Sequence, residues 1–285
     1  EIGDPDFDSP PNVVEAACSA LKNGQTHYVE SSGLIEFREK AAEMTMLSRG
    51  FKPDINQILV TPGANIQLYL AIACTVNPGD EVILFDPFFV MYEPLIQLVG
   101  GVPILIDTYP HFHIDLERVE AAITDRTKLM LLNSPANPTG GVTPKAEIDK
   151  LVAGLAAHPR VALLSDEIYS QMLYDGRAHV SLLSYPEIRD RLIVLDGWSK
   201  TYAMTGWRMG YAVWPDSMVD PVTRLCINDH SCVNAAAQFA GLAALTGPKD
   251  AVDEMVRQFD SRRRVIVEAL NDLPGVRCTD AAGAF

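Results

Sequence analysis

Three polar side chains follow an apolar segment in the second half of the sequence. Residues 192–195 read LIVL, which is typical of a buried strand, and Ser199, Lys200 and Arg208 come shortly after it. A hydroxyl and a guanidinium both bind phosphate, the guanidinium through a planar array of donors. An amine beside two phosphate-binding groups indicates a phosphorylated aldehyde that Lys200 holds as a Schiff base. The alternative is a surface lysine in a turn, because lysine is mostly exposed in proteins.

Two further apolar runs, at residues 129–132 and 161–164, also end in polar residues. Continuous apolar runs favour strands that are buried on both faces, as in a parallel sheet covered by helices, and helical patterns lie between these runs. Parallel strands place their carboxyl ends at one edge of the sheet, where α/β proteins bind their ligands. We therefore expect Asn137, Asp166 and Lys200 to converge in one crevice.

A glycine turn supplies another candidate for anion binding. The apolar segment before Thr61 leads through Pro62 and Gly63 into a helical pattern rich in leucine, isoleucine and alanine. The N-terminus of a helix offers free N–H groups and the positive end of its dipole. Many such turns contain glycine, so the signal is specific only in combination with Ser199 and Arg208.

Three segments together resemble a known family. SKTYAMTGWRMGY at 199–211 resembles the lysine motif of the class I/II aminotransferases, which are fold-type I enzymes that use pyridoxal 5′-phosphate (PLP). SPANPTG at 134–140 and SDEIY at 165–169 resemble two further motifs of that family. The resemblance covers essentially the whole chain. It implies an α/β fold with a mostly parallel central sheet and helices on both faces, plus an incomplete smaller α+β domain.

The resemblance also implies a PLP site. Lys200 would form the Schiff base and carry protons, Asp166 would keep the pyridine nitrogen protonated, and Tyr169 would donate to the phenolic oxygen. The substrate would contact Gly3 and Asn137. The residues implied to surround the cofactor are Tyr28 of the partner subunit, Gly63, Ala64, Asn65, Phe89, Asn137, Asp166, Tyr169, Ser199, Lys200 and Arg208.

Several of these residues have ordinary structural alternatives. Asp166 could cap a helix, Asn137 could serve the turn before a proline, and Tyr28 could be a loop aromatic that packs on its own domain. Phe89 follows a strand-like segment, and most phenylalanines in that position belong to a core. A flat ring that covers a pyridine is the functional alternative.

The implied reaction moves an amino group between an amino acid and a 2-oxo acid. A PLP-dependent C–S lyase or synthase on the same fold, or a non-catalytic PLP-binding regulatory domain, are the alternatives. Aspartate-selecting relatives often carry a basic residue near the phosphate turn, whereas here Asn65 follows Gly63 and Ala64. The pair Phe88 and Phe89 favours apolar or aromatic amino donors.

The amino-acid composition argues against several classes of binding partner. The formal net charge of −14 over 285 residues argues against nucleic-acid or anionic-membrane binding, which favour basic surfaces. No apolar run reaches the ~20 residues that span a bilayer. Five scattered cysteines without a CxxC spacing indicate a reducing compartment, which we expect to be the cytoplasm, and no metal site. The resemblance implies a homodimer with shared active sites.

We expect the chain to divide into three structural parts. They are an N-terminal arm and helix at 1–24, a large PLP-binding domain at 25–258, and a connecting helix with the start of a small domain at 259–285. The sequence begins without methionine and ends in an apparent strand, so we expect a fragment of a longer protein. The family's arginine for the substrate α-carboxylate would then lie beyond Phe285.

Overall fold

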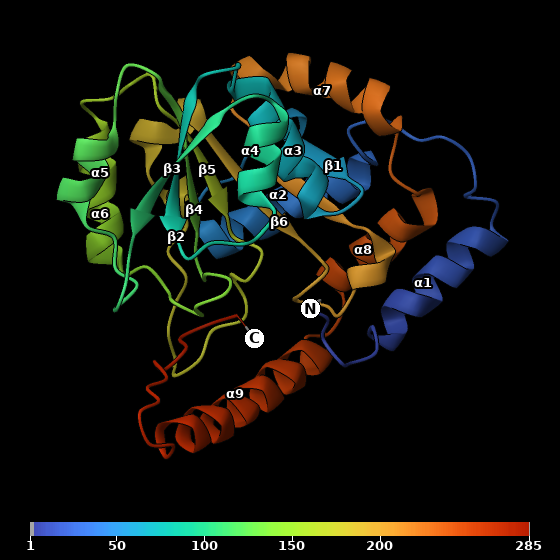
Figure 1. The fold of residues 1–285 in the computed structure, drawn as a ribbon. Helices are drawn as coiled ribbons and strands as arrows, with labels where there is room; N and C mark the ends of the chain where they lie inside the picture. Colours follow the sequence, from blue (N-terminus) through green and yellow to red (C-terminus); the bar gives the residue numbers. More distant parts are fainter. Residues whose placement is uncertain (1–2, 285) are drawn as a thin grey trace.

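A seven-stranded sheet forms the centre of the computed structural model, which describes residues 3–284 (Figure 1). Its strand order is β1-β7-β6-β5-β4-β2-β3, and within the described residues only β7 runs antiparallel to its neighbours. The strands are β1 (Ile58–Thr61), β2 (Glu81–Asp86), β3 (Val102–Asp107), β4 (Thr127–Asn133), β5 (Ala162–Asp166), β6 (Leu192–Gly197) and β7 (Gly210–Val213). The predicted fold class is thereby confirmed.

Helices cover both faces of the sheet. The helices are α1 (Pro11–Lys22), α2 (Ile35–Arg49), α3 (Ala64–Thr75), α4 (Tyr92–Leu98), α5 (Leu116–Ala122), α6 (Lys145–Leu155), α7 (Asp216–His230), α8 (Ala235–Thr246) and α9 (Asp250–Asn271). One apolar core joins the sheet to α1, α2, α5, α6 and α8. A second core joins the opposite face to α3, α4 and α7. Strands buried between two helical layers explain the continuous apolar runs in the sequence.

The central strands end together, as the apolar runs predicted. Asn133 at the end of β4 pairs with Asp166 at the end of β5, and Asp166 pairs with Leu195 in β6. All three strands are parallel, so the polar residues that follow them meet at one edge of the sheet. The turn after β6 carries Lys200 to the same edge.

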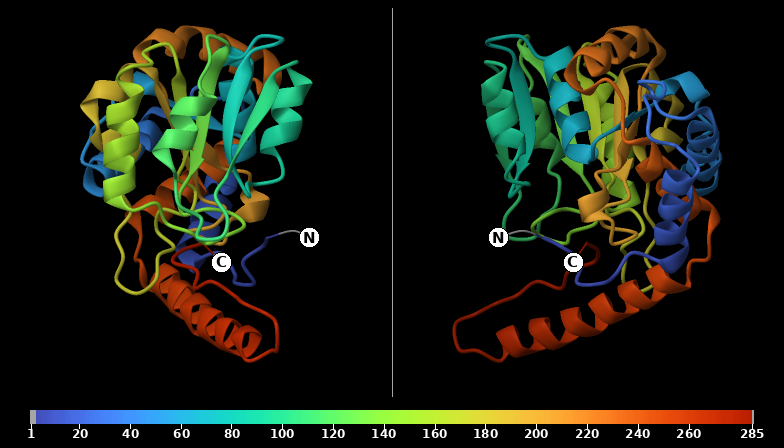
Figure 2. Two further views of the ribbon diagram at one scale, coloured as in Figure 1. Left: turned by 60° about the vertical axis from the view of Figure 1, so that its left-hand side comes forward. Right: turned by 90° about the vertical axis from the view of Figure 1, so that its right-hand side faces the viewer.

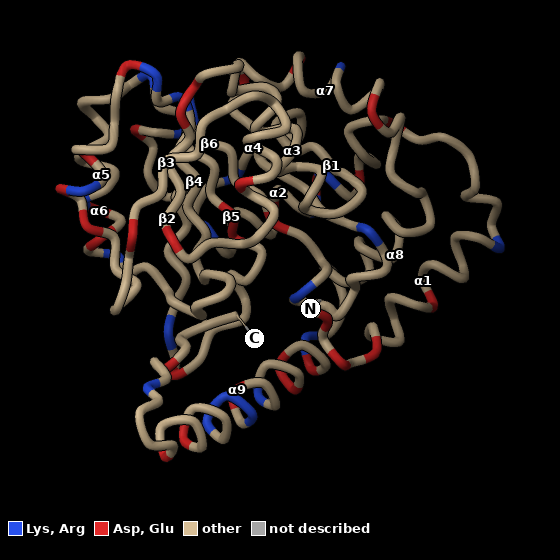
Figure 3. Tube along the Cα trace, in the orientation of Figure 1, with Lys and Arg blue, Asp and Glu red and all other residues tan. Residues whose placement is uncertain are grey.

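The N-terminal arm and α9 lie on the side to which the strands point (Figures 1 and 2). The arm contacts α9 through an ion pair of 2.6 Å between Asp6 and Arg262, and through the edge-to-face rings of Phe7 and Phe259. Both acidic and basic residues lie along α9 (Figure 3). The ion pair and the ring contact attach the arm to α9.

The sequence patterns did not predict two of the strands, β3 and β7. β3 has mixed burial because it is the edge strand, and β7 has only four residues. The predicted domain boundary at 258/259 falls inside the continuous helix α9, and the division into domains stays a prediction. The first two residues of the predicted arm, and Phe285 in the predicted final strand, lie outside the described residues. Within 3–284, no helix has the length and apolar character to cross a bilayer.

Candidate active site

A cavity of about 530 Å³ lies at the carboxyl edge of the sheet. Volumes of this order are typical of sites for small ligands and cofactors. It is bounded by the arm, the N-terminus of α3, the segment before α4, and the turns after β4, β5 and β6. The predicted site residues that line it are Gly3, Ala64, Asn65, Phe89, Asn137, Asp166, Tyr169, Ser199, Lys200 and Arg208.

Lys200 follows β6 in a turn, and its side chain enters the cavity. Its ammonium donates a hydrogen bond to the backbone carbonyl of Gly3 in the arm. Burial lowers the pKa of the Lys200 amine; the nearby carboxylate of Asp4 opposes this shift, and the guanidinium of Arg208 adds to it. A lowered pKa increases the fraction of neutral amine, which is the nucleophilic form.

Asp166 is buried at the end of β5. One carboxylate oxygen accepts a hydrogen bond of 2.7 Å from the Tyr92 hydroxyl, and the other accepts one of 3.2 Å from the Ile168 amide. Burial raises the pKa of Asp166 to about 6, against these two hydrogen bonds, which lower it. The nearby carboxylates of Asp196 and Glu167 raise it further. A buried carboxylate of this kind favours a cation beside it.

Arg208 and the N-terminus of α3 form the anion-binding side of the cavity. Gly63 precedes α3 with a φ of 90°, which favours glycine, and a Cβ there would lie 2.3 Å from Nη2 of Arg208. Arg208 Nη1 also donates 2.7 Å to the carbonyl of Thr205. A Cβ on Gly210 in β7 would lie 2.4 Å from the amide nitrogen of Ala64. Two glycines thus allow the arginine and the helix end to approach each other.

Asn137 and Tyr169 occupy the next part of the wall. The Asn137 amide donates a long hydrogen bond of 3.4 Å to the Tyr169 hydroxyl, and burial raises the pKa of Tyr169. The backbone amide of Asn137 is held by the side-chain oxygen of Asn133 at 2.8 Å. Asn133 in turn donates 3.0 Å to the carbonyl of Asp166, so it ties two predicted site segments together.

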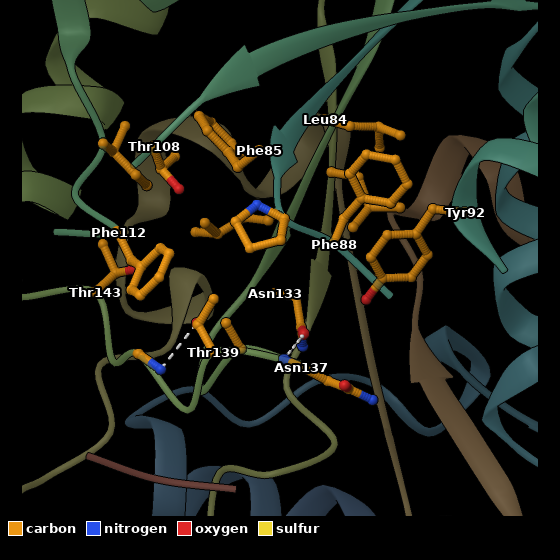
Figure 4. Close-up of a pocket in the computed structure, with 16 residues that line it drawn as sticks. Leu84, Phe85, Phe88, Tyr92, Thr108, Phe112, Asn133, Asn137, Thr139 and Thr143 are labelled. Carbon is orange, nitrogen blue, oxygen red and sulfur yellow. Dashed lines mark hydrogen bonds between the residues drawn. The ribbon is translucent and has the colours of Figure 1, made fainter. Parts of the chain in front are cut away.

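The pair Phe88 and Phe89 divides between two cavities. Phe89 lines the large cavity and meets the ring of Tyr92 edge-on, with centroids 5.6 Å apart. Phe88 lines a second cavity of about 40 Å³, which Figure 4 shows with Phe85 and Phe112 around it and Asn137 at its border. This smaller space holds water molecules at most. Phe89 is therefore the ring of the pair that faces the larger cavity.

Two predicted site residues, Gly63 and Tyr28, do not line the cavity. Gly63 lies directly behind the lining, against Arg208, whereas Tyr28 is 87% exposed. Sequence reasoning also missed two groups at the site. Tyr92 was hidden because its aromatic side chain suggested core packing, and Asp4 because the arm's acidic composition suggested only an irregular segment. The signal for Tyr92 was its place at the start of a helix, three residues after the end of the DPFF segment.

Comparison with known proteins identifies the family. The family model for aminotransferase class I and II matches residues 1–285. The chain is 40% identical to the aspartate aminotransferase of Streptomyces avermitilis, over 99% of this chain and 70% of that protein. The chain belongs to the class I and II aminotransferases. It is accordingly a PLP-dependent aminotransferase that acts on amino acids and 2-oxo acids.

Solved structures agree with this assignment. The crystal structure of an aspartate aminotransferase from Rhizobium meliloti superposes with a TM-score of 0.97 at 36% identity, covering 100% of this chain and 72% of that chain. An aromatic aminotransferase from Pyrococcus horikoshii superposes with a TM-score of 0.96 at 34% identity, covering 100% and 77%. The match to fold-type I aminotransferases extends over the whole chain.

The cavity fits PLP on its own chemistry. It presents one amine of lowered pKa, one buried carboxylate, and an arginine over a helix N-terminus, which suit an aldehyde, a pyridine nitrogen and a phosphate. Gly63 lets the guanidinium of Arg208 lie close to the N-terminus of α3, and a cation beside the free amides of a helix end suits a phosphate.

Proposed function

We propose that Lys200 binds the cofactor covalently through a Schiff base, and that Asp166 pairs with its ring nitrogen. The observation that carries this proposal is the convergence of Lys200, Asp166 and Arg208 on one cavity. Ser199, Arg208 and the first amides of α3 would hold the phosphate. When bound, PLP supplies an electron-withdrawing ring that accepts the electrons released when the α-proton of an amino acid leaves.

The proposed roles of the remaining groups follow from where they lie. Lys200 Nζ, once free of its covalent bond, has the lowered pKa that suits it to take and return the α-proton. Asn137 and Tyr169 would donate to the phenolic oxygen, with Asn137 also near the substrate. Gly3 would contact the substrate through its backbone, and Phe89 would cover one face of the ring.

The experiment compares two variants, Lys200→Ala and Arg208→Gln, with the wild type. We expect Lys200→Ala to lose turnover and the visible absorption that depends on a covalently bound amine, while Arg208→Gln keeps this absorption at a high PLP concentration. Visible absorption that persists in Lys200→Ala at the wild-type wavelength contradicts the assignment of the lysine. Release of ammonia and pyruvate from a β-substituted amino acid, without transamination, would indicate the lyase alternative.

For the amino donor, we propose a neutral amino acid with an apolar or aromatic side chain. Asp4 lines the cavity and hydrogen-bonds the Thr205 hydroxyl at 2.6 Å, so it adds negative charge near the substrate. Asn65 contributes no positive charge, and Phe89 offers an apolar face. The test compares kcat/KM for phenylalanine, leucine and aspartate. A strong preference for aspartate, which several relatives carry in their names, overturns this donor class and leaves the aminotransferase assignment intact.

We also propose a homodimer with shared active sites, in the cytoplasm. The exposed Tyr28 supports the first point, since an aromatic side chain of that exposure suits an interface. Five free cysteines support a reducing compartment. Mixing Lys200→Ala with Tyr28→Ala should restore activity, because one site of each hybrid dimer then has both residues intact. Mixtures as inactive as the separate variants argue against shared sites.

A further inference from the structure

A cluster of buried ionisable side chains lies behind the active site, outside the cavity. The Arg49 cluster consists of Arg49, Glu167, Asp196 and His179, whose side chains are 4%, 1%, 9% and 8% exposed. Its members come from the end of α2, the residue after β5, the end of β6 and the loop that follows β5. None of them lines the cavity that holds Lys200.

The guanidinium of Arg49 bridges two strand ends. Its Nε donates to Glu167 Oε2 at 2.7 Å, and its Nη2 donates to Asp196 Oδ2 at 2.5 Å. The planar fork of arginine suits two acceptors in fixed directions, whereas a lysine ammonium acts as a point charge. Arg49 thereby links the residue beside Asp166 to the residue four positions before Lys200.

Glu167 is held on its other sides as well. Its Oε1 accepts hydrogen bonds from the hydroxyls of Ser165 at 3.0 Å and Ser181 at 2.8 Å, and Nε2 of His179 lies 3.0 Å from Oε2. Burial acts to raise the pKa of Glu167, but His179 and Arg49 outweigh it and hold the pKa at about 2. Glu167 is therefore an ionised and fixed group directly after Asp166.

Asp196 connects Arg49 to the turn that carries Lys200. Its Oδ1 accepts from the amide of Gly197 at 2.7 Å, and the amide of Glu167 donates to the carbonyl of Leu195 at 3.0 Å. The end of β6 is thus tied to the residue after β5 by side chain and by backbone. Lys200, whose side chain lines the cavity, is three residues after Gly197 in the sequence.

Buried ion pairs are poor stabilisers, since apolar residues of similar volume often stabilise a fold as well or better. Stability therefore does not explain why the Arg49 cluster lies at the ends of β5 and β6, the two strands that lead to Asp166 and Lys200. We propose that Arg49 is a positioning residue, which sets the spacing between Asp166 and Lys200 through Glu167 and Asp196. This inference rests on the cofactor roles proposed above for those two residues.

The chain offers a matched control at the opposite edge of the sheet. Glu81 begins β2, its side chain is 4% exposed, and it accepts a hydrogen bond of 2.9 Å from Arg126 and one from Thr124. Glu81→Gln and Glu167→Gln both remove one carboxylate charge from an arginine pair without changing the shape of the side chain, although Arg126 is 71% exposed and Arg49 only 4%. Only Glu167→Gln acts near the cofactor site.

The experiment measures PLP dissociation constants and thermal midpoints of the apo forms of wild type, Glu167→Gln, Arg49→Lys and Glu81→Gln. Arg49→Lys keeps the positive charge but loses the planar guanidinium, so it tests whether the two directed hydrogen bonds matter. We expect Glu167→Gln and Arg49→Lys to weaken PLP binding about tenfold or more, as when a group that orients a ligating side chain is removed. We also expect them to shift the pH at which the visible absorption of bound PLP changes. Glu81→Gln should lower only the thermal midpoint.

Two results overturn the proposal. In the first, Glu167→Gln and Arg49→Lys bind PLP as wild type does and differ only in thermal midpoint, as Glu81→Gln does. In the second, neither variant folds while Glu81→Gln does, so that the cluster serves folding alone. Failure of the cofactor roles is recognised separately, because then wild type and Lys200→Ala bind PLP with the same visible absorption.

Discussion

The carboxylate of Asp166 should cost the apo protein stability, and Asp166→Asn should recover part of that cost. The pKa of Asp166 rises from 3.8 to about 6 on folding, mainly because of burial. An acid whose pKa is higher in the folded state destabilises the fold when it is ionised. The cost is absent below the unfolded pKa, grows between pH 4 and 6, and is complete above the folded pKa.

The magnitude follows from this shift. At 1.36 kcal/mol per pKa unit, the ionised carboxylate costs about 3 kcal/mol at pH 8 and about half of that at pH 5. Asparagine offers one acceptor to Tyr92 and Ile168, where the carboxylate offers two, so it loses one hydrogen bond worth about 1 kcal/mol. We expect a net gain of about 2 kcal/mol at pH 8 and under about 1 kcal/mol at pH 5.

Urea denaturation of the apo protein at pH 5 and pH 8 tests the expectation. The gain in stability should be larger at pH 8 than at pH 5 by roughly 1 kcal/mol, and this difference, which does not depend on the lost hydrogen bond, decides the outcome. Asp149→Asn is the control, since Asp149 also accepts from a tyrosine, at 2.6 Å from Tyr185, but is exposed with a pKa lowered by Lys145. A gain for Asp166→Asn that is equal at both pH values, or a loss at pH 8, refutes the reasoning.

Three further predictions concern the same site. Tyr92→Phe removes a hydrogen bond that lowers the pKa of Asp166, so the weakening of PLP affinity on acidification should begin about one pH unit higher, measured by fluorescence titration from pH 5 to 8. Arg208→Gln should weaken PLP binding by about 2 kcal/mol but leave binding of pyridoxal, which has no phosphate, nearly unchanged; equal weakening of both ligands contradicts a phosphate contact. Gly210→Ala places a Cβ 2.4 Å from the amide nitrogen of Ala64, so it should destabilise the protein by about 1–3 kcal/mol in urea denaturation and weaken PLP binding; a neutral effect on both means that the helix end can shift freely.

The sequence alone determined the layered α/β fold and the place of the cavity. Runs that are apolar on every residue, separated by helical patterns, define strands buried on both faces, and parallel strands end at one edge. Because this rule depends only on local pattern and chain direction, it predicts that Asn137, Asp166 and Lys200 lie at one edge of the sheet. The motifs around them carried the family resemblance.

The tertiary structure decided which side chains support those three residues. The contact of Tyr92 with Asp166 joins residues 74 positions apart, and that of Arg49 with Glu167 joins residues 118 apart. No period in the sequence reports such pairings, because hydrophobic patterning records which face of an element is buried and not which polar atom meets it. The antiparallel insertion of β7 between β1 and β6 is of the same kind, since a four-residue strand gains its place from the strands beside it.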